Sequence, residues 1–198
     1  MDKDTKLPQD YRQTAKYELL SSRKDILIVN GLTIFLFLFM CVIGVLLLIG
    51  KRPLPVLELS AGKYLGWMFA VLFFILAYVA LHMWIHGRMM RYFSGEKPFY
   101  GIRSLYLYAG CNAFFSRREY LIILLAPFVS AGILLLLLTL MLSPIWSPAA
   151  YIIQIFNVSV SGRDLAAAYY IRKQSDDILI QDTGLSVAVY SASSGFPV

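Results

Sequence analysis

Four long blocks of apolar residues constrain this chain more than any other feature. They cover about residues 25–50, 64–93, 120–142 and 148–171. A helix needs about 20 apolar residues to cross a hydrocarbon core of about 30 Å, and each block reaches that length. Charged residues make up only 15% of the chain, whereas a soluble domain has about a quarter. The sequence therefore predicts an all-α protein of the cell membrane with about four transmembrane helices and the lipid bilayer as its surroundings.

The charges of the connecting segments predict how these helices are oriented. Basic residues are concentrated before the first block and between the second and third blocks. The positive-inside rule places both segments in the cytoplasm. We therefore expect a cytoplasmic N-terminal segment (1–24), a membrane domain (25–171) and a cytoplasmic C-terminal tail (172–198). The same rule, together with anionic lipid headgroups, accounts for the net charge of +6 and argues against nucleic-acid binding.

Three segments outside the blocks carry local patterns. Residues 11–20 can form a short surface helix or a solvated tail. Residues 99–109 are rich in aromatic side chains and predict a small cytoplasmic hairpin between the second and third helices. The alternative is an amphipathic segment on the membrane surface, whereas an extended strand there could pair with a peptide by β-augmentation. The tail predicts a second hairpin around Asp182-Thr183-Gly184.

Both histidines of the chain lie in the second block, four residues apart. Side chains at this spacing share one helix face, with Cβ atoms about 5–6 Å apart. Two histidines bind one zinc ion in this way in the H-E-x-x-H motif of metalloproteases. Here the segment reads His82-Met83-Trp84-Ile85-His86, so the ligand spacing is intact. A methionine, however, stands where the motif has its general-base glutamate.

The fourth block carries an acid at the same expected depth in the membrane. His82 is eighteen residues after the start of its block, and Asp164 is sixteen after the start of the fourth. Two histidines and a carboxylate form a three-ligand zinc set with an open fourth position. The alternative is structural: the histidines bond to a neighbouring helix, and Asp164 pairs with Arg163 or Arg172.

These residues resemble the small bacterial putative zincin peptidase family, membrane metalloproteases similar to site-2 proteases. The resemblance extends over about residues 81–190. Its motifs are His82-x-x-x-His86-Gly87, Lys97-Pro98 with Gly101, the segment from Tyr120 to Pro127, Asn157, Ser161-Gly162-Arg163-Asp164, Asp182 and Tyr190. The resemblance implies that His82, His86 and Asp164 bind zinc, and that Asn157 lines the site as a substrate or oxyanion donor.

Met83 is the departure from that family, in which glutamate follows the first histidine and activates the attacking water. Loss of a general base lowers a rate by about 10²–10⁴. Three functions therefore stay open. The first is a zinc-binding pseudoenzyme that captures a peptide or membrane-protein partner. The second is an active intramembrane-type metallopeptidase, with another base or with the methionine as an introduced change. The third is a non-catalytic membrane scaffold or transporter-accessory subunit.

Overall fold

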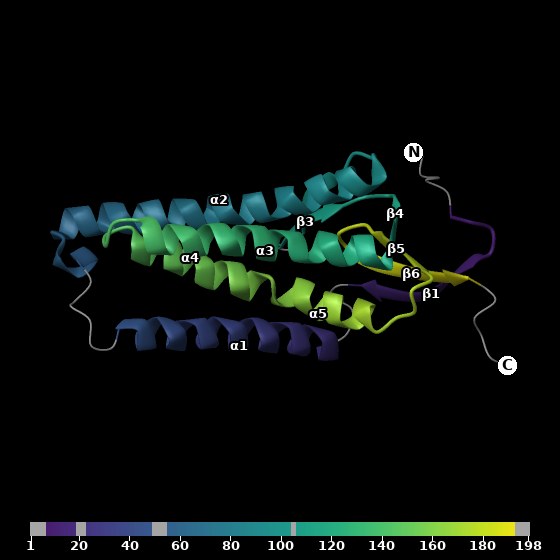
Figure 1. Ribbon diagram of the computed structural model, residues 1–198, viewed down its shortest axis with the longest axis horizontal. Coiled ribbons are helices and arrows are strands. Elements are labelled where there is room, and N and C mark those ends of the chain that lie inside the picture. Colours follow the sequence, from purple (N-terminus) through teal and green to yellow (C-terminus); the bar gives the residue numbers. More distant parts are fainter. Residues whose placement is uncertain (1–6, 19–22, 49–54, 104–105, 193–198) are drawn as a thin grey trace. The chain divides into compact units, whose positions relative to one another are not determined.

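The computed structural model describes residues 7–18, 23–48, 55–103 and 106–192. Helices and strands follow one another along these ranges as Figure 1 shows. The elements are β1 (Tyr11–Glu18), α1 (Arg23–Leu48), the 3₁₀ helix η1 (Pro55–Glu58), α2 (Ala61–Ser94), β2 (Phe99–Arg103), β3 (Tyr106–Gly110), β4 (Phe114–Ser116), α3 (Arg117–Met141), α4 (Ser147–Val160), α5 (Gly162–Arg172), β5 (Ile178–Asp182) and β6 (Ser186–Ala192).

Three helices of the described chain are long and apolar enough to cross a membrane. These segments are Leu27–Leu47 of α1, Ala61–Ser94 (α2) and Arg117–Met141 (α3). They expose large apolar side chains, with Phe69 70% and Leu140 74% exposed. Exposed apolar surface on this scale is favourable only against lipid or another protein. The first three predicted spans thus correspond to helices, while residues 49–50 of the first lie outside the described ranges.

The fourth predicted span is divided into two helices, α4 and α5. Its division falls at Ser161, whose hydroxyl donates to the Asn157 carbonyl at 2.7 Å. Ser159 donates in the same way to the Ile155 carbonyl at 2.7 Å. Such bonds from serine to the carbonyl four residues earlier compete with the helix's own ladder and tend to bend it. The fourth predicted span is therefore two helices and not one continuous helix, and its crossing of the membrane stays a prediction.

One compact unit, the sheet unit, comprises Met1–Ile28, Met83–Pro127 and Asp164–Val198. It holds an antiparallel four-stranded sheet in the order β1-β6-β5-β4 and the separate hairpin β2-β3. The two hairpins predicted for residues 99–109 and for the tail are present, while the cytoplasmic location of the first stays a prediction. Buried side chains from the sheet, α2, α3 and α5 form its core, among them Met90, Phe115, Tyr120, Ile171 and Ile180.

Strand β1 was not expected from the sequence, and the prediction of a surface helix or solvated tail over residues 11–20 is wrong. Residues Tyr11–Glu18 pair antiparallel with β6, in a register that runs from Tyr11 opposite Ala192 to Glu18 opposite Ser186. Ala15 packs against the core, and the Thr14 hydroxyl donates to the Val189 carbonyl at 3.2 Å. The partner strand is about 175 residues away, so no local pattern could reveal it.

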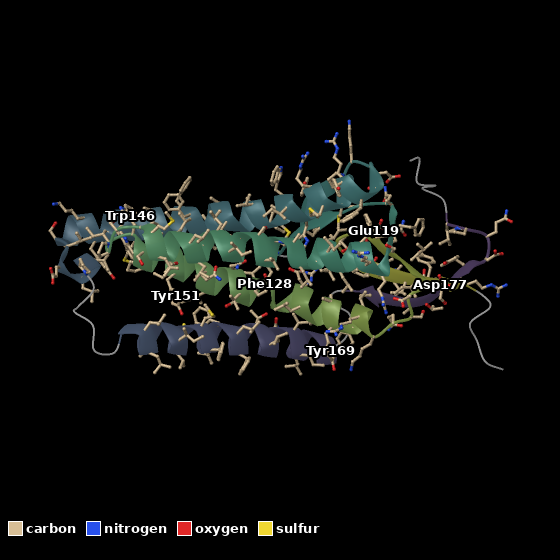
Figure 2. The ribbon with its side chains drawn as sticks, in the orientation of Figure 1. Glu119, Phe128, Trp146, Tyr151, Tyr169 and Asp177 are labelled. Carbon is tan, nitrogen blue, oxygen red and sulfur yellow. The ribbon has the colours of Figure 1, made fainter. Side chains whose placement is uncertain are left out.

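The other unit, the helical unit, comprises Val29–His82 and Phe128–Arg163. Tyr78, Ala131, Leu135 and Ile153 form its buried cluster, which joins α2, α3 and α4. Tyr151, labelled in Figure 2, connects α4 to α1 because its hydroxyl donates to the Met40 carbonyl at 2.7 Å. These contacts join α1, α2, α3 and α4 within this unit.

Candidate metal centre

Helix α2 places both histidines on its buried face. Tyr78, His82, His86 and Met90 follow one another at intervals of four residues, and their exposed fractions are 5%, 1%, 7% and 2%. Between them, Trp84 is 53% exposed. A helix repeats every 3.6 residues, so this spacing keeps the four side chains in one inward-facing stripe. The two imidazoles are therefore buried one turn apart on a single helix.

Asp164 supplies the carboxylate from the first turn of α5. Its Oδ2 lies 3.4 Å from Nε2 of His86, and its side chain is 16% exposed. One ligand atom from each of His82, His86 and Asp164 lies within 4.8 Å of the other two. The structure thus brings together the three residues that the depth argument places at one level.

The chemistry of this donor set fits a zinc ion. Two imidazole nitrogens and one carboxylate are the protein ligands of several catalytic zinc sites, which keep the fourth position open. Buried ionisable groups in a membrane domain are costly unless they are paired or bind an ion. His82, His86 and Asp164 could therefore hold a metal ion.

The other ring nitrogen of each histidine has a hydrogen-bond partner. Nδ1 of His86 lies 3.0 Å from the Ile123 carbonyl of α3. Nδ1 of His82 lies 2.9 Å from the hydroxyl of Tyr78, one turn earlier on α2. The sequence analysis missed Tyr78, although its position four residues before His82 places it on the same helix face.

Asn157 of α4 is fully buried and bonds to Tyr78. The Tyr78 hydroxyl donates to Asn157 Oδ1 at 2.7 Å, and Asn157 Nδ2 donates to the Phe128 carbonyl at 3.3 Å. Glycine at position 132 makes room for this amide, because a Cβ there would lie 3.2 Å from Nδ2. The role of Asn157 as a substrate or oxyanion donor stays a prediction; its contacts here are with other side chains and the backbone.

Two further acids, Glu119 and Asp182, are held by different hydrogen bonds. Glu119 accepts a hydrogen bond from the Ser116 amide at 3.0 Å and so caps α3. Asp182 at the end of β5 accepts from the Tyr120 hydroxyl at 2.8 Å and from the Gly184 amide at 2.7 Å. The charge of Asp182 also acts on His86. The sequence analysis placed Asp182 in a turn but missed this electrostatic link to the site.

Comparison with known proteins agrees with the geometry. The profile of a family described as "putative zincin peptidase" matches residues 74–179, more than half of the chain. The matched segment contains both histidines, Asn157 and Asp164. Neither a curated protein nor a solved structure matches the chain.

Proposed function

Because the chain belongs to the putative zincin peptidase family, we propose that it is a membrane-embedded zinc-binding protein that captures a peptide or membrane-protein partner and hydrolyses it poorly or not at all. The observation that carries this proposal is the buried convergence of His82, His86 and Asp164 within 4.8 Å. Zinc, when bound, supplies Lewis-acid chemistry for attack on a peptide carbonyl.

Met83 is the reason to propose weak or absent hydrolysis. The residue after the first histidine is where the H-E-x-x-H motif has the base that takes a proton from water. A thioether has no site that accepts a proton near neutral pH, so Met83 cannot replace the glutamate. Partner capture without cleavage then becomes the function that the ligand set and this methionine support best.

The sheet supports four membrane crossings, with both chain ends in the cytoplasm. Strands β1, β4 and β5 belong to one sheet, so they must lie on the same side of the membrane. One crossing by α3 takes the chain to the other side, and only α4 and α5 remain to bring it back before β5. Together their 14 and 11 residues span about 37 Å, enough for a core of about 30 Å. Basic residues near β1 and β4 assign this side to the cytoplasm.

Metal analysis of the purified protein tests the zinc site. We expect about one zinc ion per chain, and loss of most of it in His82→Ala and Asp164→Ala, since each change removes one of three protein ligands. Asp177→Ala is the matched control, because Asp177 is an exposed acid beyond α5 (Figure 2). Zinc content that does not change in His82→Ala would favour the scaffold function instead.

A base restored at position 83 tests the catalytic part of the proposal. Met83→Glu is expected to raise peptide cleavage by about 10²–10⁴ over the unaltered protein, the usual contribution of a general base. Met83→Gln has the same side-chain shape without a base and should stay at the unaltered rate.

An active peptidase is the second candidate, and the acid to test as its base is Asp182, whose charge acts on His86. In that case the unaltered protein cleaves as fast as Met83→Glu, and Asp182→Asn abolishes the cleavage. That pair of results would overturn the pseudoenzyme proposal while leaving the zinc site intact.

A further inference from the structure

The contacts of Asn157 fix which way its amide points. Its Nδ2 lies 3.3 Å from the Phe128 carbonyl and 3.4 Å from Oε1 of Gln154. Both partners are hydrogen-bond acceptors, so the atom facing them must be the NH₂ group. The atom facing Tyr78 is therefore the amide oxygen, which can only accept.

This orientation fixes the proton of Tyr78 and, through it, the proton of His82. A tyrosine hydroxyl has one proton, and at 2.7 Å Tyr78 donates it to Oδ1 of Asn157. The Tyr78 oxygen must then accept from Nδ1 of His82, 2.9 Å away. In a neutral imidazole with the proton on Nδ1, the lone pair that can bind a metal is on Nε2.

The proton of His86 is also held on Nδ1, but by a different contact, which depends on Pro127. In a helix the amide of residue 127 would donate to the carbonyl of residue 123, but proline has no amide proton. The Ile123 carbonyl therefore lacks its helical donor and accepts from Nδ1 of His86 at 3.0 Å. When an ion is bound, Nε2 of His86 then carries the lone pair; without an ion, Nε2 lies 3.4 Å from the Asp164 carboxylate and can donate a proton to it.

We propose that Tyr78 with Asn157, and Pro127 through the Ile123 carbonyl, are positioning residues that hold both histidines as the Nδ1–H tautomer and so present two Nε2 atoms to the zinc ion. This inference rests on the proposed zinc site. Partners of this kind orient metal-binding histidines in many proteins, and their removal costs about 10–100-fold in metal affinity. The competing explanation is that these bonds only satisfy buried polar groups.

Nitrogen-15 NMR of the metal-free protein tests the tautomers directly, because the chain has only two histidines. At a pH where both rings are neutral, we expect Nδ1 of His82 to carry the proton, and Nδ1 of His86 to carry it in the Asp164→Ala variant, in which no carboxylate accepts from Nε2. Histidine in water prefers the proton on Nε2, so the expected result can arise only from the structure. Protons on Nε2 of both rings would overturn the proposal even if the protein binds zinc. Absence of zinc binding with both protons on Nδ1 would instead overturn the proposed function.

Tyr78→Phe removes the acceptor of the His82 proton and keeps the ring. We expect His82 to lose its tautomer preference, His86 to keep it, and zinc affinity to fall about 10–100-fold in competition with a chelator. Tyr151→Phe is the control, because it removes a tyrosine hydroxyl bond of 2.7 Å to the Met40 carbonyl of α1. Equal zinc affinity in the two variants would show that Tyr78 has a structural role only.

The variant Pro127→Ala tests whether Pro127 positions His86 or only affects the stability of α3. The new amide donates to the Ile123 carbonyl and competes with His86, so we expect zinc affinity to fall about 10–100-fold. The same change improves helix α3, so resistance to unfolding should not fall. Pro148→Ala in the first turn of α4 is the control, since a proline there interrupts no helical bond. Unaltered zinc affinity in Pro127→Ala would overturn the role of the proline.

Discussion

Glu119 shows how one side chain can be excluded from catalysis by its local structure. The Ser116 amide donates to Glu119 Oε2 at 3.0 Å, and the Glu119 amide lies 3.4 Å from Ser116 Oγ. Together they form a capping box, in which two unpaired amides at a helix start are satisfied reciprocally. The carboxylate is therefore held at the start of α3, and this role explains its place in the sequence without a catalytic one.

Removing this cap should lower the stability of the protein. Glu119→Ala leaves the Ser116 amide without its carboxylate acceptor, and we expect the free energy of unfolding in detergent to fall by about 0.5–2 kcal/mol. Glu58→Ala, at an exposed position in η1, is the matched control and should change little. If both variants unfold alike, the capping bond does not stabilise α3.

Among individual residues, the sequence predicts the metal ligands better than it predicts the residues that hydrogen-bond to those ligands. Two histidines at helical spacing and an acid at equal depth are visible in the chain, and the structure brings them together. The bond between Tyr78 and Asn157 joins residues 79 positions apart. It depends on how closely α2 and α4 pack, which no local pattern specifies. The use of Pro127 was equally hidden, because a proline inside a helix by itself indicates only a bend in that helix.

The turn between β5 and β6 shows why the hairpin of the tail could be predicted from the sequence. Gly184 has a φ of 74°, a backbone conformation that side chains with a Cβ rarely adopt. Asp182 accepts from the Gly184 amide at 2.7 Å, as aspartate commonly does in turns. The Asp-Thr-Gly sequence therefore specifies this turn locally, whatever the rest of the chain does.

Gly184→Ala should weaken the sheet through this turn. A Cβ at this position would contact the Tyr108 ring and lie 2.8 Å from the Ala109 carbonyl oxygen, in addition to the strain at positive φ. We expect a loss of about 1–3 kcal/mol in the free energy of unfolding. Gly62→Ala is the control, because a Cβ there meets nothing within 4 Å. Equal stability of the two variants would contradict the packing of the turn against β3.

Elements were predicted well where the signal is local and poorly where it is not. Length and hydropathy indicate α1, α2 and α3, since a lipid-exposed helix must satisfy every backbone group within itself. The division between α4 and α5 arises from serine bonds that compete with a helix, and hydropathy does not report them. Strands β1 and β4 are stabilised by distant partners, so their sequences alone did not indicate strands.

At the scale of the whole molecule, the proposed topology can be read by chemical labelling. A membrane-impermeant maleimide would be applied to intact and to lysed cells, with Cys41 and Cys111 replaced by alanine. The labelled positions are single cysteines at three exposed sites, Gln9, Ser175 and Ser143. We expect Gln9→Cys and Ser175→Cys to react only after lysis and Ser143→Cys to react in intact cells. Opposite behaviour of the first two would rule out one sheet that contains both β1 and β5.

The pairing of β1 with β6 also has a consequence for biosynthesis. A ribosome releases the first strand long before it makes the last one, and about 170 residues separate the two. Until β6 has been made, the side of β1 that will pair with β6 exposes backbone groups that another extended chain could join. Chains that stop before β6 would leave the backbone groups of β1 without this partner, so we expect such chains to aggregate more readily than chains that contain β6.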